Sequence, residues 1–349
     1  MGKTTTKPAL TQRRLAEALN ISYLTVNRAL AGHSAVSDKT SRRVLEAADR
    51  MGYRVNHAAR SLKMQKTFSI GLVGCNTPHS FWADILAEFE VRCRAKDYHV
   101  MVCHRLAGES SNRCAEFLVE RRVDGIVIAP DDTTENPDQL KRILGDTPVL
   151  FLNSAVAGIA SAGVGTNSRA GMKQLTEYLI ELGHRDFCYI SGPQCDYTAQ
   201  QRHLGFREAV AGLQQGGSGR IRIEHAKSFC QEDGAQITRD LLAGGQALPT
   251  AMVCGNDALA IGASIELARA GVRIPQDVSV AGYAGMREAT FLPAPLTTVS
   301  QPVFQLGRLC AQLILARIAD PDGPTAFTEI EDTLTIREST GSPRATALN

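Results

Sequence analysis

The sequence lacks the features of membrane and secreted proteins. It has no apolar run approaching the ~20 residues of a membrane-spanning helix, and no apolar stretch typical of a secretion signal lies near its first residue. Its nine cysteines are odd in number and contain no Cys-x-x-Cys spacing. This usage argues against a disulfide framework and a zinc site and favours reduced thiols. We therefore expect a cytoplasmic protein.

The sequence also lacks the short motifs of common enzyme classes. It contains no Gly-x-Ser-x-Gly elbow, no Gly-x-x-x-x-Gly-Lys-Ser/Thr loop and no His-Glu-x-x-His helix. Gly163-Val-Gly165 and Gly216-Gly-Ser-Gly219 are rich in glycine but lack the rest of a nucleotide fingerprint, so we interpret both as loops. The eight histidines show no obvious metal-ligand spacing. We expect no catalytic residues, no metal, no cofactor and no enzyme.

Charge is divided unevenly along the 349 residues, although the net charge is only +2. Residues 1–69 hold 13 Lys and Arg against four Asp and Glu, a balance of +9. The other 280 residues hold 25 basic and 32 acidic side chains, a balance of −7. A basic head on an acidic body is typical of a nucleic-acid-binding module joined to another domain. Charge alone leaves open a solvated basic extension that binds nothing in particular.

Helical periodicity in the basic head predicts three short helices. The first follows Thr11 and ends near Asn20, the second spans 23–31, and the third spans 38–51. The positions expected to pack inward are Leu15, Ala18, Leu19, Val26, Ala29, Leu30, Val44, Leu45 and Ala48. A three-residue turn between the first two helices is typical of a helix-turn-helix.

In such a motif the second helix enters the major groove of DNA. Arg28 can donate two hydrogen bonds to guanine, and Asn27 can pair in the same way with adenine. Hydroxyls at helix starts are suited to hold phosphates. The candidate DNA-binding residues of the head are Thr11, Ser22, Tyr23, Leu24, Asn27, Arg28, Ser37 and Thr40. The alternative is a small helical bundle with an incidentally polar surface.

From residue 68 onward, β-rich runs alternate with helical stretches. The expected strands are 68–73, 99–103, 125–129 and 149–152 in one set, and 187–190, 221–223, 251–254 and 278–282 in a second. Near-continuous apolar strands separated by helices predict two α/β lobes, each built on a doubly wound parallel sheet. Because ligands of such folds lie beyond the carboxyl ends of the strands, facing lobes would close on a small molecule.

Several segments resemble the lactose/galactose repressor family of bacterial transcriptional regulators. In the head they are Leu-Ala-Glu-Ala-Leu-Asn-Ile-Ser-Tyr-Leu-Thr-Val-Asn-Arg-Ala-Leu at 15–30, Val-Ser-Asp-Lys-Thr at 36–40 and Met-Gly-Tyr-Arg-Val-Asn-His-Ala-Ala-Arg-Ser-Leu at 51–62. The resemblance continues to about residue 340, through Leu-Gly-His-Arg at 182–185, Gly-Asn-Asp-Ala-Leu-Ala at 255–260 and Pro-Leu-Thr-Thr-Val-Ser-Gln at 295–301. It implies an all-α helix-turn-helix head and a two-lobed body like that of periplasmic binding proteins.

The resemblance also implies the division of the chain. It places a DNA-binding domain at 1–54, a hinge helix and linker at 55–67, and an effector-binding and dimerisation domain at 68–340. That domain has an N-lobe of about 68–166 plus 301–329 and a C-lobe of about 167–300 plus 330–340.

In the hinge, Asn56 can cap a short helix, Ala59 matches the residue that faces the minor groove, and Leu62 matches the leucine that wedges between base steps. Without the resemblance, this segment would be interpreted as a plain basic linker.

By the same resemblance, an effector pocket lies between the lobes. Its expected lining residues are Phe81, Trp82, Asn153, Arg202, Phe229, Asn256 and Gln301. Core packing is the alternative for Phe81 and Trp82. We expect Asp257 to cap the helix that follows it and His184 to have a structural role.

The pocket departs from the family pattern in its carboxylates. The family commonly has two aspartates after the Gly-Tyr that ends the last strand, and the first of them binds sugar hydroxyls; here these positions are Ala284-Gly285. The position of another pocket aspartate is Asn153 in this sequence. A ligand carboxylate prefers an arginine that no nearby carboxylate opposes. We therefore hypothesise an acidic effector, such as a sugar acid, rather than a neutral sugar.

The sequence as a whole predicts a sequence-specific DNA-binding transcriptional repressor controlled by a sugar acid or sugar. Its expected partners are a palindromic double-stranded operator, the effector and a second copy of the chain, as a homodimer or higher oligomer. No membrane partner is expected. The alternative is a solute-binding protein without a gene-regulatory role, which would not need the basic head.

Overall fold

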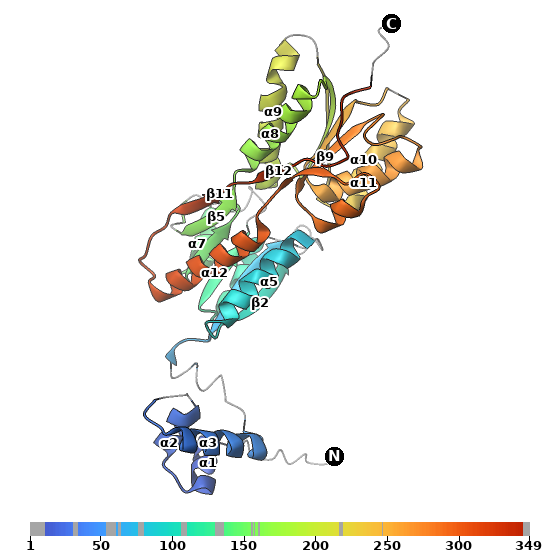
Figure 1. Cartoon of the computed structure of the whole chain (residues 1–349). Coiled ribbons are helices and arrows are strands. Elements are labelled where there is room, and N and C mark those ends of the chain that lie inside the picture. The colour runs from blue at the N-terminus through green and yellow to red at the C-terminus, as the bar shows by residue number, and fades with distance from the viewer. Residues whose placement is uncertain are drawn as a thin grey trace, which may run out of the picture. The chain divides into compact units, whose positions relative to one another are not determined.

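The computed structural model describes residues 11–30, 34–53, 61, 64–75, 80–105, 110–129, 136–154, 156, 158–159, 161–215, 219–245 and 247–344. The chain divides into two compact units, a head up to Thr67 and a body from Phe68 (Figure 1). Each unit is described by itself below. Of the helices in the described part of the chain, none has both the length and the apolar character needed to cross a bilayer.

The head consists of three helices, α1 (Gln12–Leu19), α2 (Tyr23–Leu30) and α3 (Asp38–Met51). Asn20 ends α1 and Gly52 ends α3, both in the left-handed conformation with φ of 54° and 70°. This backbone region is one that asparagine tolerates and glycine favours. The residue types at these two positions therefore stop the helices where periodicity predicts.

Two of the expected inward positions in the head are wrong. Ala18 and Leu45 are exposed, whereas Ala16 and Ala47 are buried. Successive residues of a helix lie about 100° apart, so the buried stripe of α1 is centred between Leu15 and Ala16 and turns Ala18 outward. The buried core of the head consists of Leu15, Ala16, Leu19, Val26, Ala29, Val44, Ala47 and Ala48.

The N-lobe of the body is built on a six-stranded parallel sheet of order β11-β5-β4-β3-β1-β2. The strands are β1 (Ser69–Cys75), β2 (His99–Arg105), β3 (Gly125–Ile128), β4 (Val149–Leu152), β5 (Ala162–Thr166) and β11 (Phe327–Ile330). Its helices are α5 (Ser80–Arg94), α6 (Ser111–Glu120), α7 (Pro137–Leu144) and α12 (Val303–Ala319). The pairs α5–α12 and α6–α7 pack in two separate cores, which makes the sheet doubly wound (Figure 1).

The C-lobe repeats the scheme with the order β12-β10-β9-β8-β6-β7. The strands are β6 (Asp186–Ser191), β7 (Arg220–His225), β8 (Ala251–Cys254), β9 (Ser279–Ala284), β10 (Thr297–Ser300) and β12 (Thr333–Thr335). Its helices are α8 (Ser168–Glu181), α9 (Tyr197–Gln215), α10 (Gln231–Ala243), α11 (Asp257–Arg269) and the 3-10 helix η1 (Arg287–Phe291). All pairings are parallel except that of β12 with β10. Two parallel-dominated α/β lobes confirm the predicted fold class.

The interpretation of Gly163-Val-Gly165 as a loop is wrong, because these residues lie in the buried strand β5. A Cβ atom built on Gly163 would lie 2.5 Å from the ring of Phe327, and one on Gly165 would lie 2.8 Å from the Cα of Asn153. The glycines therefore allow close approach by neighbouring strands. Val164 and Thr166 are the β-branched residues of this strand, and the glycines beside them are depleted in strands, so the sequence pattern favours a loop.

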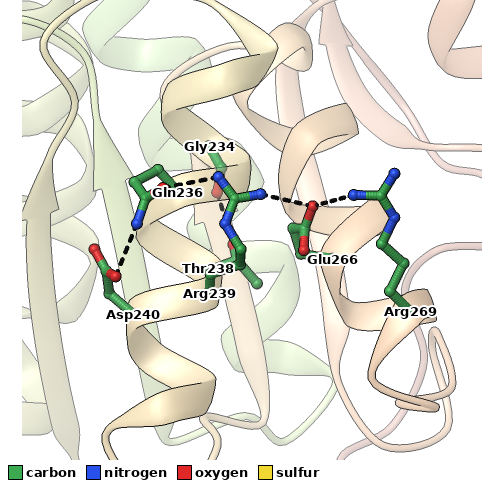
Figure 2. Close-up of polar contacts among 7 residues, drawn as sticks. All are labelled: Gly234, Gln236, Thr238, Arg239, Asp240, Glu266 and Arg269. Atoms are coloured by element: carbon green, nitrogen blue, oxygen red, sulfur yellow. Dashed lines mark hydrogen bonds and ion pairs between the residues drawn. The ribbon is translucent and has the colours of Figure 1, made fainter.

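In the C-lobe, α10 and α11 pack closely enough that a Cβ on Gly262 would lie 1.9 Å from the carbonyl oxygen of Gln231. A polar network spans the two helices (Figure 2). The side chain of Glu266 is only 7% exposed and accepts from Arg239 at 2.9 Å and from Arg269 at 2.7 Å. The two guanidiniums compensate the buried carboxylate and hold the helices together.

Candidate DNA-binding face and effector site

Hydroxyl side chains cap the helices of the head. The amide of Thr25 donates to Ser22 Oγ at 3.0 Å, and the amide of Thr40 donates to Ser37 Oγ at 3.4 Å. Thr11 Oγ1 accepts from the amide of Arg14 at 3.4 Å. Thr11, Ser22 and Ser37 are exposed, and Thr40 is half-buried. Their positions suit phosphate contacts, because helix N-termini favour anions.

The second helix presents the side chains predicted to meet DNA bases. Tyr23 and Leu24 are 47% and 54% exposed, and Arg28 is also exposed. Asn27 is half-buried, and its Nδ2 donates to Gln12 Oε1 at 3.2 Å. In this geometry Arg28 is open to a ligand, whereas Asn27 has one of its donors occupied. The predicted hinge residues Asn56, Ala59 and Leu62 lie outside the described residues.

Arg202, from α9, is buried among polar and aromatic groups of the C-lobe. Its Nη1 donates to the carbonyl of Gly255 at 2.8 Å, and its guanidinium carbon lies 4.1 Å from the ring centroid of Tyr283 and 5.8 Å from that of Phe229. Its Nη2 reaches Gln301 Oε1 only at 3.5 Å. Its Nε has no hydrogen-bond partner among the described residues. The guanidinium therefore has donor capacity left for an acceptor.

Gln301 joins this arginine to the N-lobe. Its Nε2 donates to the hydroxyl of Thr166, at the end of β5, at 2.8 Å. Asn153 lies beside the same strand, with its amide bonded to the carbonyl of Val164 at 2.8 Å and its backbone in the left-handed region, φ 65°. Asn153 Oδ1 is buried without a hydrogen-bond partner among the described residues. Arg202 and Gln301 are thus in contact, and Asn153, which follows β4, lies beside the strand that Gln301 reaches.

Asn256, rather than Asp257, caps α11, so that expectation is wrong. Asn256 Oδ1 accepts from the amide of Leu259 at 2.9 Å, and its Nδ2 donates to the carbonyl of Phe229 at 3.2 Å. Asp257, the first helical residue, instead accepts from Thr298 Oγ1 at 2.6 Å and from the amide of Met286 at 2.7 Å. The fold uses Asn256 to place Phe229, and Asp257 to hold the segment after β9.

Phe81 and Trp82 lie at the start of α5, with ring centroids 5.5 Å apart. Both rings pack against the N-lobe core, and Phe81 also contacts Ala284 and Met286 of the C-lobe. The same end of α5 makes two polar contacts with η1: Ser80 to Glu288 at 2.5 Å and Arg287 to Asp84 at 3.2 Å. The packing alternative for these rings therefore holds in part, since Phe81 lies where the lobes touch.

The reasoning that Arg202 is unopposed by carboxylates is wrong. Asp196 and Asp332, neither singled out from sequence, lie close enough for the guanidinium to lower their pKa values. Burial has the larger, opposite effect on both, so that the pKa of each carboxyl is raised overall. Asp196 accepts from the hydroxyl of Thr198 and from the amide of Ala199.

His184 has the structural role expected of it. It is fully buried, with Nδ1 2.9 Å from Thr250 Oγ1 and Nε2 2.8 Å from the carbonyl of Gly341. Burial lowers the pKa of its imidazole. Within the described ranges, no group of three or more His, Cys, Asp or Glu residues is placed to hold a metal ion.

Sequence reasoning missed three members of the Arg202 site: Thr166, Tyr283 and Asp332. The ring of Tyr283 lies under the guanidinium, and its hydroxyl donates to Asp332 Oδ2. Tyr283 directly follows the last predicted strand, 278–282, a position that points to a ligand site in such folds. Asp332 had no such signal, because it lies between two short strands that were not predicted.

Comparison with known proteins matches residues 176–340 to a periplasmic binding protein-like domain. The chain is 30% identical over 334 residues to the HTH-type transcriptional repressor PurR of Histophilus somni, covering 94% of this chain and 98% of that one. It is also 30% identical to the probable HTH-type transcriptional repressor ExuR of Bacillus subtilis, covering 90% and 93% of the two chains. The chain belongs to the lactose/galactose repressor family of bacterial transcriptional regulators.

A solved structure has the same fold. The lac repressor dimer bound to operator and the anti-inducer ONPF superposes with a TM-score of 0.83 at 24% identity, covering 95% of this chain and 99% of that one. The present protein is a DNA-binding transcriptional repressor with an effector-binding body. The predicted family and function are confirmed.

Proposed function

We propose that this repressor binds a palindromic operator as a homodimer in the cytoplasm, without catalysing a reaction, and that a small sugar acid bound at Arg202 controls it. The observation that carries the proposal is the buried guanidinium of Arg202. It is 6% exposed, its Nε is unpartnered within the described chain, and its contact with Gln301 is long. A ligand carboxylate or hydroxyl oxygen would complete its hydrogen bonds.

The acidic effector is favoured even though two carboxylates lie near Arg202. Tyr283 donates to Asp332 and two donors hold Asp196, so both carboxylates already have partners other than the guanidinium. Burial raises the pKa of both carboxyls, and the nearby guanidinium of Arg202 has the smaller, opposite effect. Arg202 therefore keeps positive charge that a ligand anion can neutralise.

The test is calorimetric titration of the full chain with glucose and glucuronate, galactose and galacturonate. These pairs differ only in the terminal carboxylate. We expect a uronate to bind, and Arg202→Met to abolish that binding without unfolding the body, because the variant removes the donors and keeps much of the apolar stem. Tight binding of a neutral hexose with no binding of its uronate would overturn the acidic assignment.

Two exposed apolar side chains on adjacent elements support the homodimer. Ile265 on α11 and Phe291 on η1 are 41% and 85% exposed. We propose that a second copy covers them, so that two heads read two half-sites. Phe291→Asp should yield monomers in sedimentation experiments, whereas Phe304→Asp, on the N-lobe helix α12 and 62% exposed, should not. Monomers from neither variant would contradict this surface.

Operator reading is tested by selecting bound sequences from random DNA, with and without each uronate. We expect a palindrome whose recovery changes with ligand. Leu62→Ala should weaken binding to that palindrome, because it removes the proposed apolar wedge at a base step, and leave uronate affinity unchanged. Equal operator affinity for Leu62→Ala would reject the wedge.

A further inference from the structure

The chain passes between the two sheets of the body three times. It does so after β5 at Thr166, after β10 near Gln301, and between β11 and β12 at Asp332. Any motion of one lobe against the other must be absorbed at these three crossovers, because they are the covalent connections between the lobes. Each crossover contributes a polar side chain to the surroundings of Arg202.

These three side chains form one connected network. Gln301 accepts from Arg202 Nη2 at 3.5 Å and donates to Thr166 Oγ1 at 2.8 Å. The hydroxyl of Thr166 also interacts with Asp332 and lowers the pKa of that carboxyl. The network closes through Tyr283, whose hydroxyl donates to Asp332 and whose ring stacks under Arg202 with 4.1 Å between guanidinium carbon and centroid.

Two atoms of this network are buried without a hydrogen-bond partner among the described residues: Arg202 Nε and Asp332 Oδ1. Tyr283 lies between these two side chains. Its ring packs against the guanidinium of Arg202, and its hydroxyl donates to Asp332. Unpartnered buried polar atoms are costly, and in native proteins they tend to mark functional places. Here they bracket the site at which the effector is proposed to bind.

We propose that Asp332 is a positioning residue that ties Arg202, through Tyr283 and Thr166, to all three crossovers, so that events at Arg202 are transmitted to the lobe connections. The part of this inference that concerns the effector rests on the proposed function. The charged and titratable groups that face Asp332 are the guanidinium of Arg202 from α9, the neutral phenol of Tyr283 from β9 and the carboxylate of Glu329 from β11. A carboxylate acceptor holds the Tyr283 hydroxyl more strongly than a neutral one.

The direct test is hydrogen exchange of the full chain without ligand. Asp332→Asn keeps the side-chain shape and can still accept from Tyr283, but it loses the charge. We expect amides near Thr166 and Gln301 to exchange roughly three- to tenfold faster in this variant, as well as those near Asp332. The matched control is Glu331→Gln, which removes an exposed charge from the same crossover and should leave the other two unchanged.

Tyr283→Phe removes the donor of the same bond and should reproduce the Asp332→Asn pattern. The double variant should then add little, because both changes act on the same Tyr283–Asp332 hydrogen bond: one removes its donor and the other weakens its acceptor. Faster exchange confined to the Asp332 crossover, or an equal effect of Glu331→Gln, would overturn the coupling.

A second arm measures how far glucuronate or galacturonate changes operator affinity. In Asp332→Asn that change, measured with the uronate at saturation for each protein, should shrink about tenfold, or ~1.4 kcal/mol of coupling free energy. Unreduced coupling would count against Asp332. If no uronate binds the wild-type chain, the proposed effector class fails, and the exchange experiment still decides the role of Asp332.

Discussion

The buried carboxyl of Asp257 should make the stability of the C-lobe depend on pH near neutrality. Burial raises the pKa of Asp257 from 3.8 to about 6, against the opposing hydrogen bonds from Thr298 and the amides of Met286 and Gly285. Because the folded pKa lies above the unfolded one, the fold favours the protonated form. The stability linked to this proton is fully present below pH 3.8 and is lost as the pH rises through about 6.

The magnitude follows from the size of the shift. A change from 3.8 to about 6 corresponds to about 3 kcal/mol, of which about 2 kcal/mol falls between pH 4.5 and 7. Asp257→Asn removes the charge but can keep the bonds. Its amide oxygen can accept from Met286, and its amide nitrogen can donate to the Thr298 hydroxyl once that hydroxyl rotates. Relative to wild type, the variant should gain about 2 kcal/mol of unfolding free energy from pH 4.5 to pH 7.

Urea unfolding of the full chain, followed by far-ultraviolet circular dichroism at several pH values, measures this difference. Asp240→Asn, at an exposed carboxylate on α10, is the control and should run parallel to wild type. Asp257→Ala should lose about 1–3 kcal/mol at every pH, because it leaves the Thr298 hydroxyl and the Met286 amide without their acceptor. Parallel curves for wild type and Asp257→Asn would refute the buried-charge argument.

Three further outcomes are expected. In thermal unfolding, Glu266→Gln should lower the free energy of unfolding by about 1 kcal/mol. Replacing Arg239 and Arg269 together by Met should lower it by more, because only this change leaves a buried charge unpaired; the reverse order would contradict this. Ser37→Ala should destabilise the head by about 1 kcal/mol through loss of an N-cap, measured by circular dichroism. Arg28→Ala should weaken operator binding by about 1–3 kcal/mol and relax the preference at one base pair, whereas a uniform loss across sequences in a gel-shift assay would indicate a phosphate contact instead.

Local chemistry was readable from the sequence. Helix caps at Thr11, Ser22 and Ser37 depend on neighbours three residues away, and the apolar strands depend on runs within a single segment. The helix-turn-helix, the two α/β lobes and the candidate Arg202 followed from such patterns or from the family resemblance they support. The basic head and the acidic body likewise followed from composition alone.

The tertiary structure decided what no local pattern carries. Strand β5 consists largely of small residues and exists because Phe327 and Asn153 pack against its glycines. Asn256 rather than Asp257 caps α11, because the Asp257 carboxylate finds donors after β9, about 30 residues away in the chain. Asp332 lies near Arg202 only because the third crossover returns there. Residue types set which hydrogen bonds are possible. The distances between side chains in the folded chain decide which of these bonds form, and burial of the titratable groups decides their pKa values.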